Sequence, residues 1–373
     1  MKDYIYFDHA ATTPIHSEVL DVLADKLKSL PGNPSSSHSL GQRARMEIEQ
    51  SRNKIATLLN VKSSELFFTS GATEAINMIL RGAIAKNKIN HVITSALEHH
   101  AVLSSIKNIT PEISVDFVEH NSQGEINLVH LDKLLSSNPN SLVAIMGVNN
   151  EIGNINPIDD ISDLCQKYNA KLFCDMVQAV GKTKINLPKV DFASFTAHKF
   201  YGSKGVGFAY ISAKSQVTPL LFGGGQEQNM RAGTENTAFI IGLAKALEIV
   251  YRDFDKQLKH ITELNHYFVE QLAKSSCKIE YIGSKTDKVP HIVNFSILNY
   301  PDIDSLHILL DMNKICVSAG SACASGSVQK SHVLSAIRDD IDHSMRVSFG
   351  RQNTKSEIDT FIHILNNQIT LKK

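Results

Sequence analysis

The sequence predicts an α/β protein whose central sheet is mostly parallel, with helices on both faces and a smaller α+β domain beside it. Between about residues 65 and 212, short β-branched and apolar runs alternate with helical patterns, as crossover connections between parallel strands require. Several runs are apolar on both faces, which is typical of strands buried within such a sheet. The predicted strands cover residues 66–69, 91–94, 143–146, 171–174 and 192–195.

Helical patterns accompany these strands. Before the sheet, Ile48, Ile55 and Leu59 fall on one face of a predicted helix. Residues 158–164 have an amphipathic helical pattern, and a further helix is predicted near residues 238–250. These helices are expected to pack on the sheet.

After the helix near residue 250, the pattern changes to a long helix, a strand near residues 291–295 and further helices. This change indicates a second, smaller domain with a boundary near residue 255. We therefore expect a large α/β domain of residues 15–255 and a small α+β domain made of residues 1–14 and 256–373.

Composition limits the class of protein. Of its 373 residues, 42% are hydrophobic and 20% charged, as in ordinary soluble proteins. Lys and Arg equal Asp and Glu in number, so charge gives no reason to expect nucleic acid or a membrane as the main ligand. The first residues lack a secretory pattern, no apolar run has bilayer-spanning length, and the five cysteines are widely spaced without CxxC pairs. These observations predict a cytoplasmic, reduced protein without a disulfide framework or structural zinc.

A lysine and an aspartate at the ends of two predicted strands suggest pyridoxal phosphate. Lys199 follows the segment containing Asp175 and Gln178 at a suitable distance. A lysine amine can form a Schiff base, and a carboxylate can hold a pyridinium nitrogen protonated. Gln178 could donate to the phenolic oxygen. Taken singly, Asp175 is more simply a helix cap, Gln178 a surface amide and Lys199 a solvated side chain.

Residues 69–74 lie between a strand and a helix, where backbone N–H groups at a helix N-terminus bind phosphate well. Thr73 adds a hydroxyl donor, and Thr196 and His198 beside the lysine could complete the phosphate site. The alternative is a capped helix whose glycine makes a tight turn. A Walker loop is not present in the sequence.

Three further polar residues follow or lie within predicted strands. His99 could stack on a cofactor ring or move protons near neutral pH, and no HExxH or Cys/His cluster suggests a metal. Asn150 could donate to a substrate carboxylate, although a simple Asn-rich turn is the alternative. Arg346 is flanked by apolar strand residues, a setting that requires an anion such as a substrate carboxylate, or a structural salt bridge.

Cys323 lies in a run of small residues, 317–327, that has little capacity for helix, strand or core burial. An exposed thiol on a mobile loop is expected there. Such a cysteine is either incidental or a nucleophile that must travel.

With these segments assembled, the chain closely resembles the cysteine desulfurases, pyridoxal-phosphate enzymes of the class V aminotransferase superfamily with the fold-type I architecture. The resemblance runs from the Asp8-His9-Ala10-Ala11-Thr12-Thr13-Pro14 segment to Arg346-Val347-Ser348-Phe349-Gly350-Arg351, with seven motifs in the right order. It implies a PLP-binding large domain and a small domain that carries the mobile cysteine loop.

The resemblance also implies a role for each site residue. Lys199 would bind the cofactor covalently, Asp175 would contact the ring nitrogen and Gln178 the phenolic oxygen, while His99 would stack on the ring and act as acid or base. The expected phosphate contacts are the backbone of Ala72 with Thr73, Thr196 and His198, joined by Thr234 from the partner subunit of a homodimer. Asn150 and Arg346 would hold the substrate carboxylate, and Cys323 would accept the sulfur.

The implied reaction removes sulfur from L-cysteine, giving L-alanine and a Cys323 persulfide. A sulfur-acceptor protein would then receive it for iron–sulfur cluster assembly or for tRNA or cofactor thiolation. The long cysteine loop is similar to that of housekeeping and nitrogen-fixation desulfurases. Thr196 stands where many relatives have serine, which keeps the hydroxyl. The sequence ends soon after Arg351, without the tail that helps some members dock their scaffold, so the acceptor stays open.

Three alternatives differ in their demands on the chain. A class V aminotransferase would not need Cys323, and a selenocysteine lyase would act far better on selenocysteine than on cysteine. A cofactor-binding scaffold without catalysis would not need the set of Lys199, His99 and Cys323, which is intact here.

Overall fold

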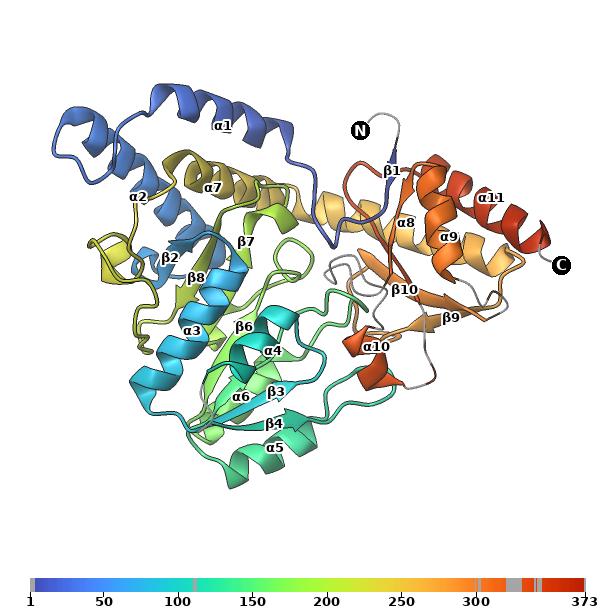
Figure 1. Ribbon diagram of the computed structural model, residues 1–373, viewed down its shortest axis with the longest axis horizontal. Helices are drawn as coiled ribbons and strands as arrows, with labels where there is room; N and C mark the ends of the chain where they lie inside the picture. The colour runs from blue at the N-terminus through green and yellow to red at the C-terminus, as the bar shows by residue number, and fades with distance from the viewer. Residues whose placement is uncertain are drawn as a thin grey trace.

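The computed structural model describes residues 4–109, 113–298, 300, 303–319, 331–338, 340 and 344–371. Its secondary structure forms two units, one around a seven-stranded sheet and one around a four-stranded sheet (Figure 1). A long helix, α8 (Phe254–Lys274), runs from the first unit into the second.

The seven-stranded sheet has the order β2-β8-β7-β6-β5-β3-β4. Strand β8 is antiparallel to both neighbours and every other pair is parallel, so the prediction of a mostly parallel sheet is confirmed. The strands are β2 (Leu66–Thr69), β3 (His91–Ser95), β4 (Ser114–Val118), β5 (Leu142–Ala144), β6 (Lys171–Asp175), β7 (Phe192–Thr196) and β8 (Gly207–Ile211).

One strand ends earlier than the sequence predicts. Residues 143–146 were expected to be extended, but β5 ends at Ala144. The reason is local, because the N–H of Met146 donates to the buried carboxylate of Glu98 at 2.7 Å instead of to the neighbouring strand. The N–H groups of Ile145 and Gly147 still donate to the carbonyls of Phe173 and Asp175, so the chain stays beside β6 before it enters the loop that carries Asn150.

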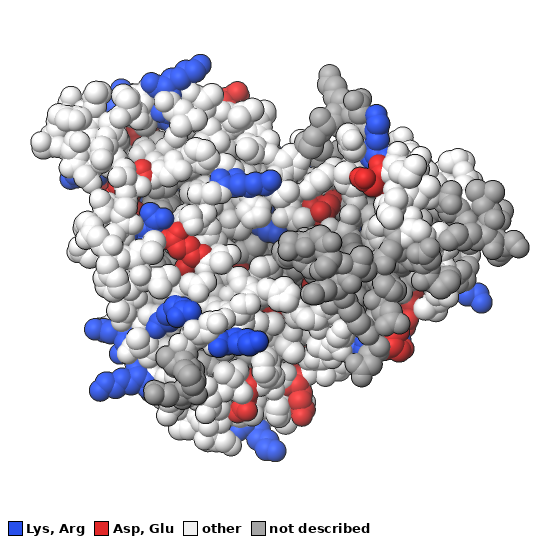
Figure 2. All heavy atoms as spheres, viewed as in Figure 1, with Lys and Arg blue, Asp and Glu red and all other residues white. Residues whose placement is uncertain are grey.

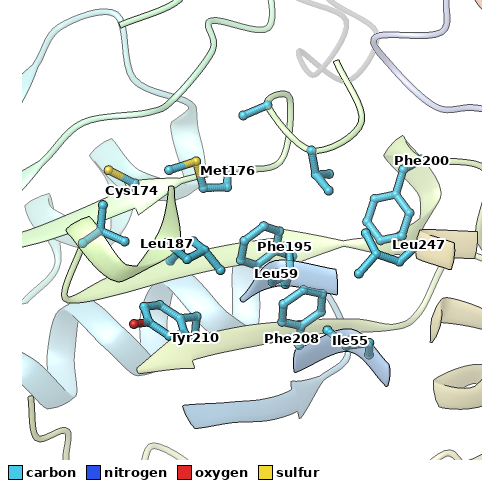
Figure 3. Packing of buried hydrophobic residues seen from close by; sticks show 14 of the residues in the cluster. Ile55, Leu59, Cys174, Met176, Leu187, Phe195, Phe200, Phe208, Tyr210 and Leu247 are labelled. Atoms are coloured by element: carbon cyan, nitrogen blue, oxygen red, sulfur yellow. The ribbon is translucent and has the colours of Figure 1, made fainter. Parts of the chain in front are cut away.

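Helices cover both faces of this sheet. On one face, α3 (Ala72–Asn87) packs against β7 and β8, and in Figure 1 it crosses in front of them. On the other face, Ile55 and Leu59 of α2 (Ser39–Leu59) and Leu247 of α7 (Thr237–Arg252) belong to the same buried cluster as the strands. Figure 3 shows this cluster, in which the rings of Phe195 and Phe208 stack with centroids 4.3 Å apart. The remaining helices of this unit are α1 (Ser17–Ser29), α4 (His100–Lys107), α5 (Leu128–Ser137) and α6 (Ile158–Lys167), with short 3-10 turns η1 (Ser63–Glu65), η2 (Leu187–Lys189), η3 (Ala197–Lys199) and η4 (Glu227–Asn229).

The second unit has an antiparallel sheet of order β12-β13-β10-β9. Its strands are β9 (Ile279–Ile282), β10 (Ile292–Ile297), β12 (Ser318–Ala319) and β13 (Met345–Ser348), and its helices besides α8 are α9 (Ile303–Met312), α10 (His332–Ile337) and α11 (Lys355–Leu371). Strand β10 begins one residue later than the predicted strand. A separate core that includes Phe268, Phe295 and Phe361 joins α8 and α11 to this sheet.

The N-terminal segment belongs to the second unit. Strand β1 (Ile5–Tyr6) pairs in parallel with β11 (Ile315–Cys316), and Phe7 is buried in the second core. The next residues then cross to the first unit, where the carbonyl of Ala10 accepts a hydrogen bond from Lys199. One short segment thus joins the two units beside the cavity described below.

The charges on the surface and the apolar length of the helices agree with the balanced charge and ordinary hydrophobic content of the sequence. Lysine and arginine are interspersed with aspartate and glutamate over the face drawn in Figure 2. Within the described part of the chain, no helix is long and apolar enough to cross a bilayer.

Candidate active site

A cavity of about 420 Å³ opens at the carboxyl ends of the parallel strands of the large sheet, where ligands of open α/β sheets bind. Most of the residues predicted from the sequence line it together. They are Ala72, Thr73, His99, Asn150, Asp175, Gln178, Thr196, His198 and Lys199. Arg346 lies behind Asn150, and Thr234 lines a different hollow. Cys323 falls outside the described residues.

One end of the cavity presents hydrogen-bond donors suited to an anion. Helix α3 begins at Ala72 directly after the β2 turn, and Gly71 at its N-cap supplies no side-chain cap. The first N–H groups of the helix therefore remain available, and the helix dipole adds positive potential. A side chain at Gly207 would lie 2.8 Å from the Cα of Gly71, so the close approach of β8 to this turn requires glycine. The alternative of a capped helix is met only in part: no N-cap side chain accepts from the first turn, but the Glu74 carboxylate accepts from the Ser70 N–H at 2.8 Å.

Asp175 is the last residue of β6 and is buried beside the cavity. Its Oδ1 accepts from the N–H of Val177 at 3.0 Å, so the carboxylate also caps the following turn. Burial raises the pKa of Asp175 to about 6, while the Val177 N–H and the Lys199 ammonium oppose that rise. A buried carboxylate in this position is best satisfied by a cationic N–H group in the cavity.

Lys199 and Gln178 converge on one backbone oxygen. The Nζ of Lys199 and the Nε2 of Gln178 each donate to the carbonyl of Ala10 at 2.7 Å. Gln178 is only 3% exposed, so its interpretation as a surface amide is wrong. The amine of Lys199 is likewise held at the cavity wall and is not a solvated side chain.

His99 is the N-cap of α4 and has a neutral ring. Its Nδ1 accepts from the N–H of Ala101 at 3.0 Å, which assigns the ring proton to Nε2. Burial, with the nearby Lys199 charge, lowers the pKa of His99 to about 4. The ring is therefore neutral near pH 7, and the expectation that His99 moves protons stays a prediction. The same two causes lower the pKa of His198 to about 4.

Arg346 has the structural ion pair that the sequence left as an alternative. Its Nη2 donates to Asp8 at 2.9 Å, and its Nη1 donates to the backbone carbonyl of Asn150 at 2.9 Å. The Nε of this guanidinium is buried and has no hydrogen-bond partner among the described residues. Arg346 therefore supports the loop of Asn150, and its Nε–H is a donor still to be satisfied.

Sequence reasoning missed four residues at or near the site. Ala10 and Asp8 belong to a run that the sequence marked only through its resemblance, and their roles depend on contacts with Lys199 and Arg346. Lys204 lines the cavity as a further cation. Lys182 is buried behind it, and the Gly181-Lys182-Thr183-Lys184 segment in which it lies gave no local signal that this lysine is buried. In the described ranges, no group of three or more His, Cys, Asp or Glu residues could hold a metal ion.

Comparison with known proteins places this geometry in a family. A family model described as aminotransferase class V matches residues 5–361. The chain is 39% identical to the cysteine desulfurase IscS of Dictyoglomus turgidum, over 98% of this chain and 94% of that protein. It is 35% identical to a putative cysteine desulfurase IscS 1 of Bacillus subtilis, over 95% of this chain and 96% of that protein.

Solved structures agree with these matches. A NifS-like protein superposes with a TM-score of 0.91 at 34% identity, covering 99% of this chain and 100% of that one. SspA in complex with cysteine superposes with a TM-score of 0.81 at 29% identity, covering 92% and 98% of the two chains. The fold predicted from the sequence is confirmed.

Proposed function

The chain belongs to the class V aminotransferase family and, within it, to the cysteine desulfurases, and from this premise we propose how its residues divide the work. The cavity holds pyridoxal 5'-phosphate, L-cysteine is the substrate, and Cys323 takes the sulfur. The observation that carries the proposal is the meeting of Lys199, Asp175 and the uncapped start of α3 in one cavity.

The residues of the cavity fit this cofactor. The N–H groups at Ala72 and Thr73, with Thr196 and His198, would hold the phosphate. Asp175 would face the ring nitrogen, since burial leaves its carboxylate in need of a cation. Gln178 and Lys199 lie side by side on the Ala10 carbonyl, which suits contacts with the phenolic oxygen and the aldehyde carbon. When bound, pyridoxal phosphate supplies an electron sink for the bonds of the substrate.

The chain's own residues then bind the substrate and move its protons. Asn150 and the Nε–H of Arg346 would hold the carboxylate of L-cysteine. The amine of Lys199 would remove and return a proton at the substrate carbon. His99 would lie against the cofactor ring and offer the proton at Nε2, because its Nδ1 already accepts from the Ala101 N–H.

Cys323 completes the reaction as the sulfur acceptor. Its thiolate forms the new S–S bond while the C–S bond of the substrate breaks, and the carbon gains a proton. The products are a Cys323 persulfide and L-alanine, so sulfur and hydrogen balance without an added oxidant. The persulfide then passes to an acceptor protein in the cytoplasm, for iron–sulfur cluster assembly or for tRNA or cofactor thiolation.

We also propose the assembly and the domain division. Thr234 is exposed and does not line the cavity of its own chain, which supports a homodimer in which it reaches the partner's phosphate site. The separate buried cores support a large domain of residues 15–255 and a small domain of residues 1–14 and 256–373.

The test measures both products. The purified protein, reconstituted with pyridoxal phosphate, is incubated with L-cysteine and a thiol reductant, and alanine and sulfide are quantified. We expect equal amounts of both, lost in Cys323→Ala and kept in the control Cys277→Ala, which changes a half-buried cysteine of the small unit. A cofactor-loaded protein that makes neither product refutes desulfuration. Faster turnover of selenocysteine than of cysteine would favour the lyase.

A further inference from the structure

Lys182 is a buried lysine behind the cavity that none of the proposed steps uses. Lys182 is buried, with only 8% of its surface exposed. Lysine is almost never buried to this extent unless it is paired, because its charged form loses hydration. A lysine buried here therefore needs a hydrogen-bond partner among the neighbouring residues.

A tight turn after β6 brings Lys182 beneath Gln178. The N–H of Lys182 donates to the carbonyl of Ala179 at 3.0 Å. Between them, Gly181 adopts a φ of +72°, and a side chain there would lie 2.2 Å from Val250. Only glycine fits this backbone, so packing fixes the turn and the place of the lysine.

The contact made by Lys182 orients an amide at the cavity wall. Its Nζ donates to the Oε1 of Gln178. The charged ammonium has only donors, whereas an amide has one accepting and one donating end, so Oε1 faces Lys182. The other end, Nε2, consequently points to the Ala10 carbonyl, where it lies beside the amine of Lys199.

We propose that Lys182 is a positioning residue that holds the Gln178 amide with its N–H end toward the phenolic oxygen of bound pyridoxal phosphate. This inference rests on the proposed function. A fixed donor at that oxygen would stabilise its anionic form, so the bound cofactor would lose its titratable proton at a lower pH. Lys182 therefore acts through Gln178 on the protonation of the cofactor.

The charges around Lys182 do not undo this arrangement. Burial lowers its pKa to about 7, with Lys199 and Arg346 acting in the same direction, and His9 and His291 lie near enough for its charge to lower their own pKa values. The neutral amine keeps two N–H donors, and the Ala10 carbonyl at the other end of the amide can only accept, so the orientation of Gln178 persists when Lys182 loses its proton.

The experiment follows the visible absorption of the bound cofactor against pH, together with the dissociation constant for pyridoxal phosphate. Lys182→Met removes the donor with little change in volume, and Lys184→Met is the control at an exposed lysine two residues away. The quantity compared is the pH at which the visible absorption of the bound cofactor has changed by half. We expect this midpoint to rise by about 1 pH unit in Lys182→Met, the size expected for one lost polar contact, and to stay unchanged in Lys184→Met. Lys182→Arg, which keeps a donor, should restore most of the wild-type midpoint.

A double-variant cycle separates positioning from direct charge. If Lys182 acts through the amide, adding Lys182→Met to Gln178→Leu produces no further shift in the midpoint. Additive shifts, or a midpoint and cofactor affinity in Lys182→Met equal to those of wild type, overturn the inference and leave the proposed function standing. A wild-type protein that binds no pyridoxal phosphate overturns both. Thermal unfolding of the apoproteins checks folding, and Lys182→Gln replaces the methionine variant if that variant does not fold.

Discussion

Removal of the buried Glu227 carboxylate should lower the free energy of unfolding far more than removal of the neighbouring exposed carboxylate of Glu49. Glu227 and Arg52 form a buried two-point ion pair, with side chains only 2% and 3% exposed and N–O distances of 2.7 and 2.8 Å. The same carboxylate accepts the N–H of Phe68 at 2.7 Å. Glu227→Ala therefore leaves the Phe68 N–H without its acceptor and the buried guanidinium without its buried counter-ion, with only the Leu66 carbonyl and the exposed Glu49 as partners, which predicts a loss of about 3–5 kcal/mol in the free energy of unfolding.

The measurement is the urea unfolding of the apoproteins, followed by circular dichroism. Glu49→Ala is the matched control, because Glu49 also contacts Arg52 but is 52% exposed, and its removal should cost about 1 kcal/mol or less. The double variant Arg52→Met with Glu227→Leu should recover most of the loss, since it leaves no unpaired charge. Equal losses in Glu227→Ala and Glu49→Ala, or a double variant as unstable as the sum of its single variants, refute the reasoning.

Three further outcomes follow from the site. His99→Ala should keep the cofactor but lower the rate of alanine formation about 100-fold or more, as loss of a positioned acid predicts, and an unchanged rate would remove His99 from the chemistry. Burial raises the pKa of Asp175 in the folded protein to about 6. Its ionised form therefore lowers the stability of the fold fully above pH 6, and this cost vanishes once the pH falls below the ordinary pKa of an aspartate. The urea midpoint of apo Asp175→Asn should therefore exceed that of wild type at pH 7 and match it at pH 3.5, with activity nevertheless lost; equal midpoints at both pH values contradict the assignment. Burial lowers the pKa of Lys182 in the folded protein to about 7. Its charge therefore reduces the free energy of unfolding fully below pH 7, and this cost disappears as the pH rises to the ordinary pKa of a lysine. Apo Lys182→Met should be more stable than wild type by about 4 kcal/mol at pH 7 and by none near pH 10.5, and a constant difference across this range counts against burial of the charge.

Most strands whose residues are buried on both sides were predicted from the sequence, although β8, which is buried at every position, was not. Strands β3, β6 and β7 were found because a run that faces core on both sides must be apolar throughout. Strand β4 was not named, since its exposed and half-buried residues at the sheet edge leave a weaker pattern.

The site was predicted in the same uneven way. Residues that follow strands, such as Asp175 and Lys199, were identified because the ends of parallel strands meet at one edge. The burial of Lys182 and the pairing of Asp8 with Arg346 depend on how distant segments meet, and no local pattern encodes that. The pKa of His99 likewise depends on the burial that the fold creates.

The N-terminal segment that joins the two units has a consequence for the order of folding. Strand β1 finds its partner β11 310 residues later along the chain, and Asp8 is separated from Arg346 by 338 residues. The carbonyl of Ala10, which receives both Lys199 and Gln178, is held in place next to these contacts. Contacts this distant form late, because closing so long a loop costs entropy before anything is gained. During synthesis on the ribosome, the seven-stranded sheet can therefore form well before the active-site lysine acquires its backbone partner, and tight cofactor capture should be delayed until β13 has emerged.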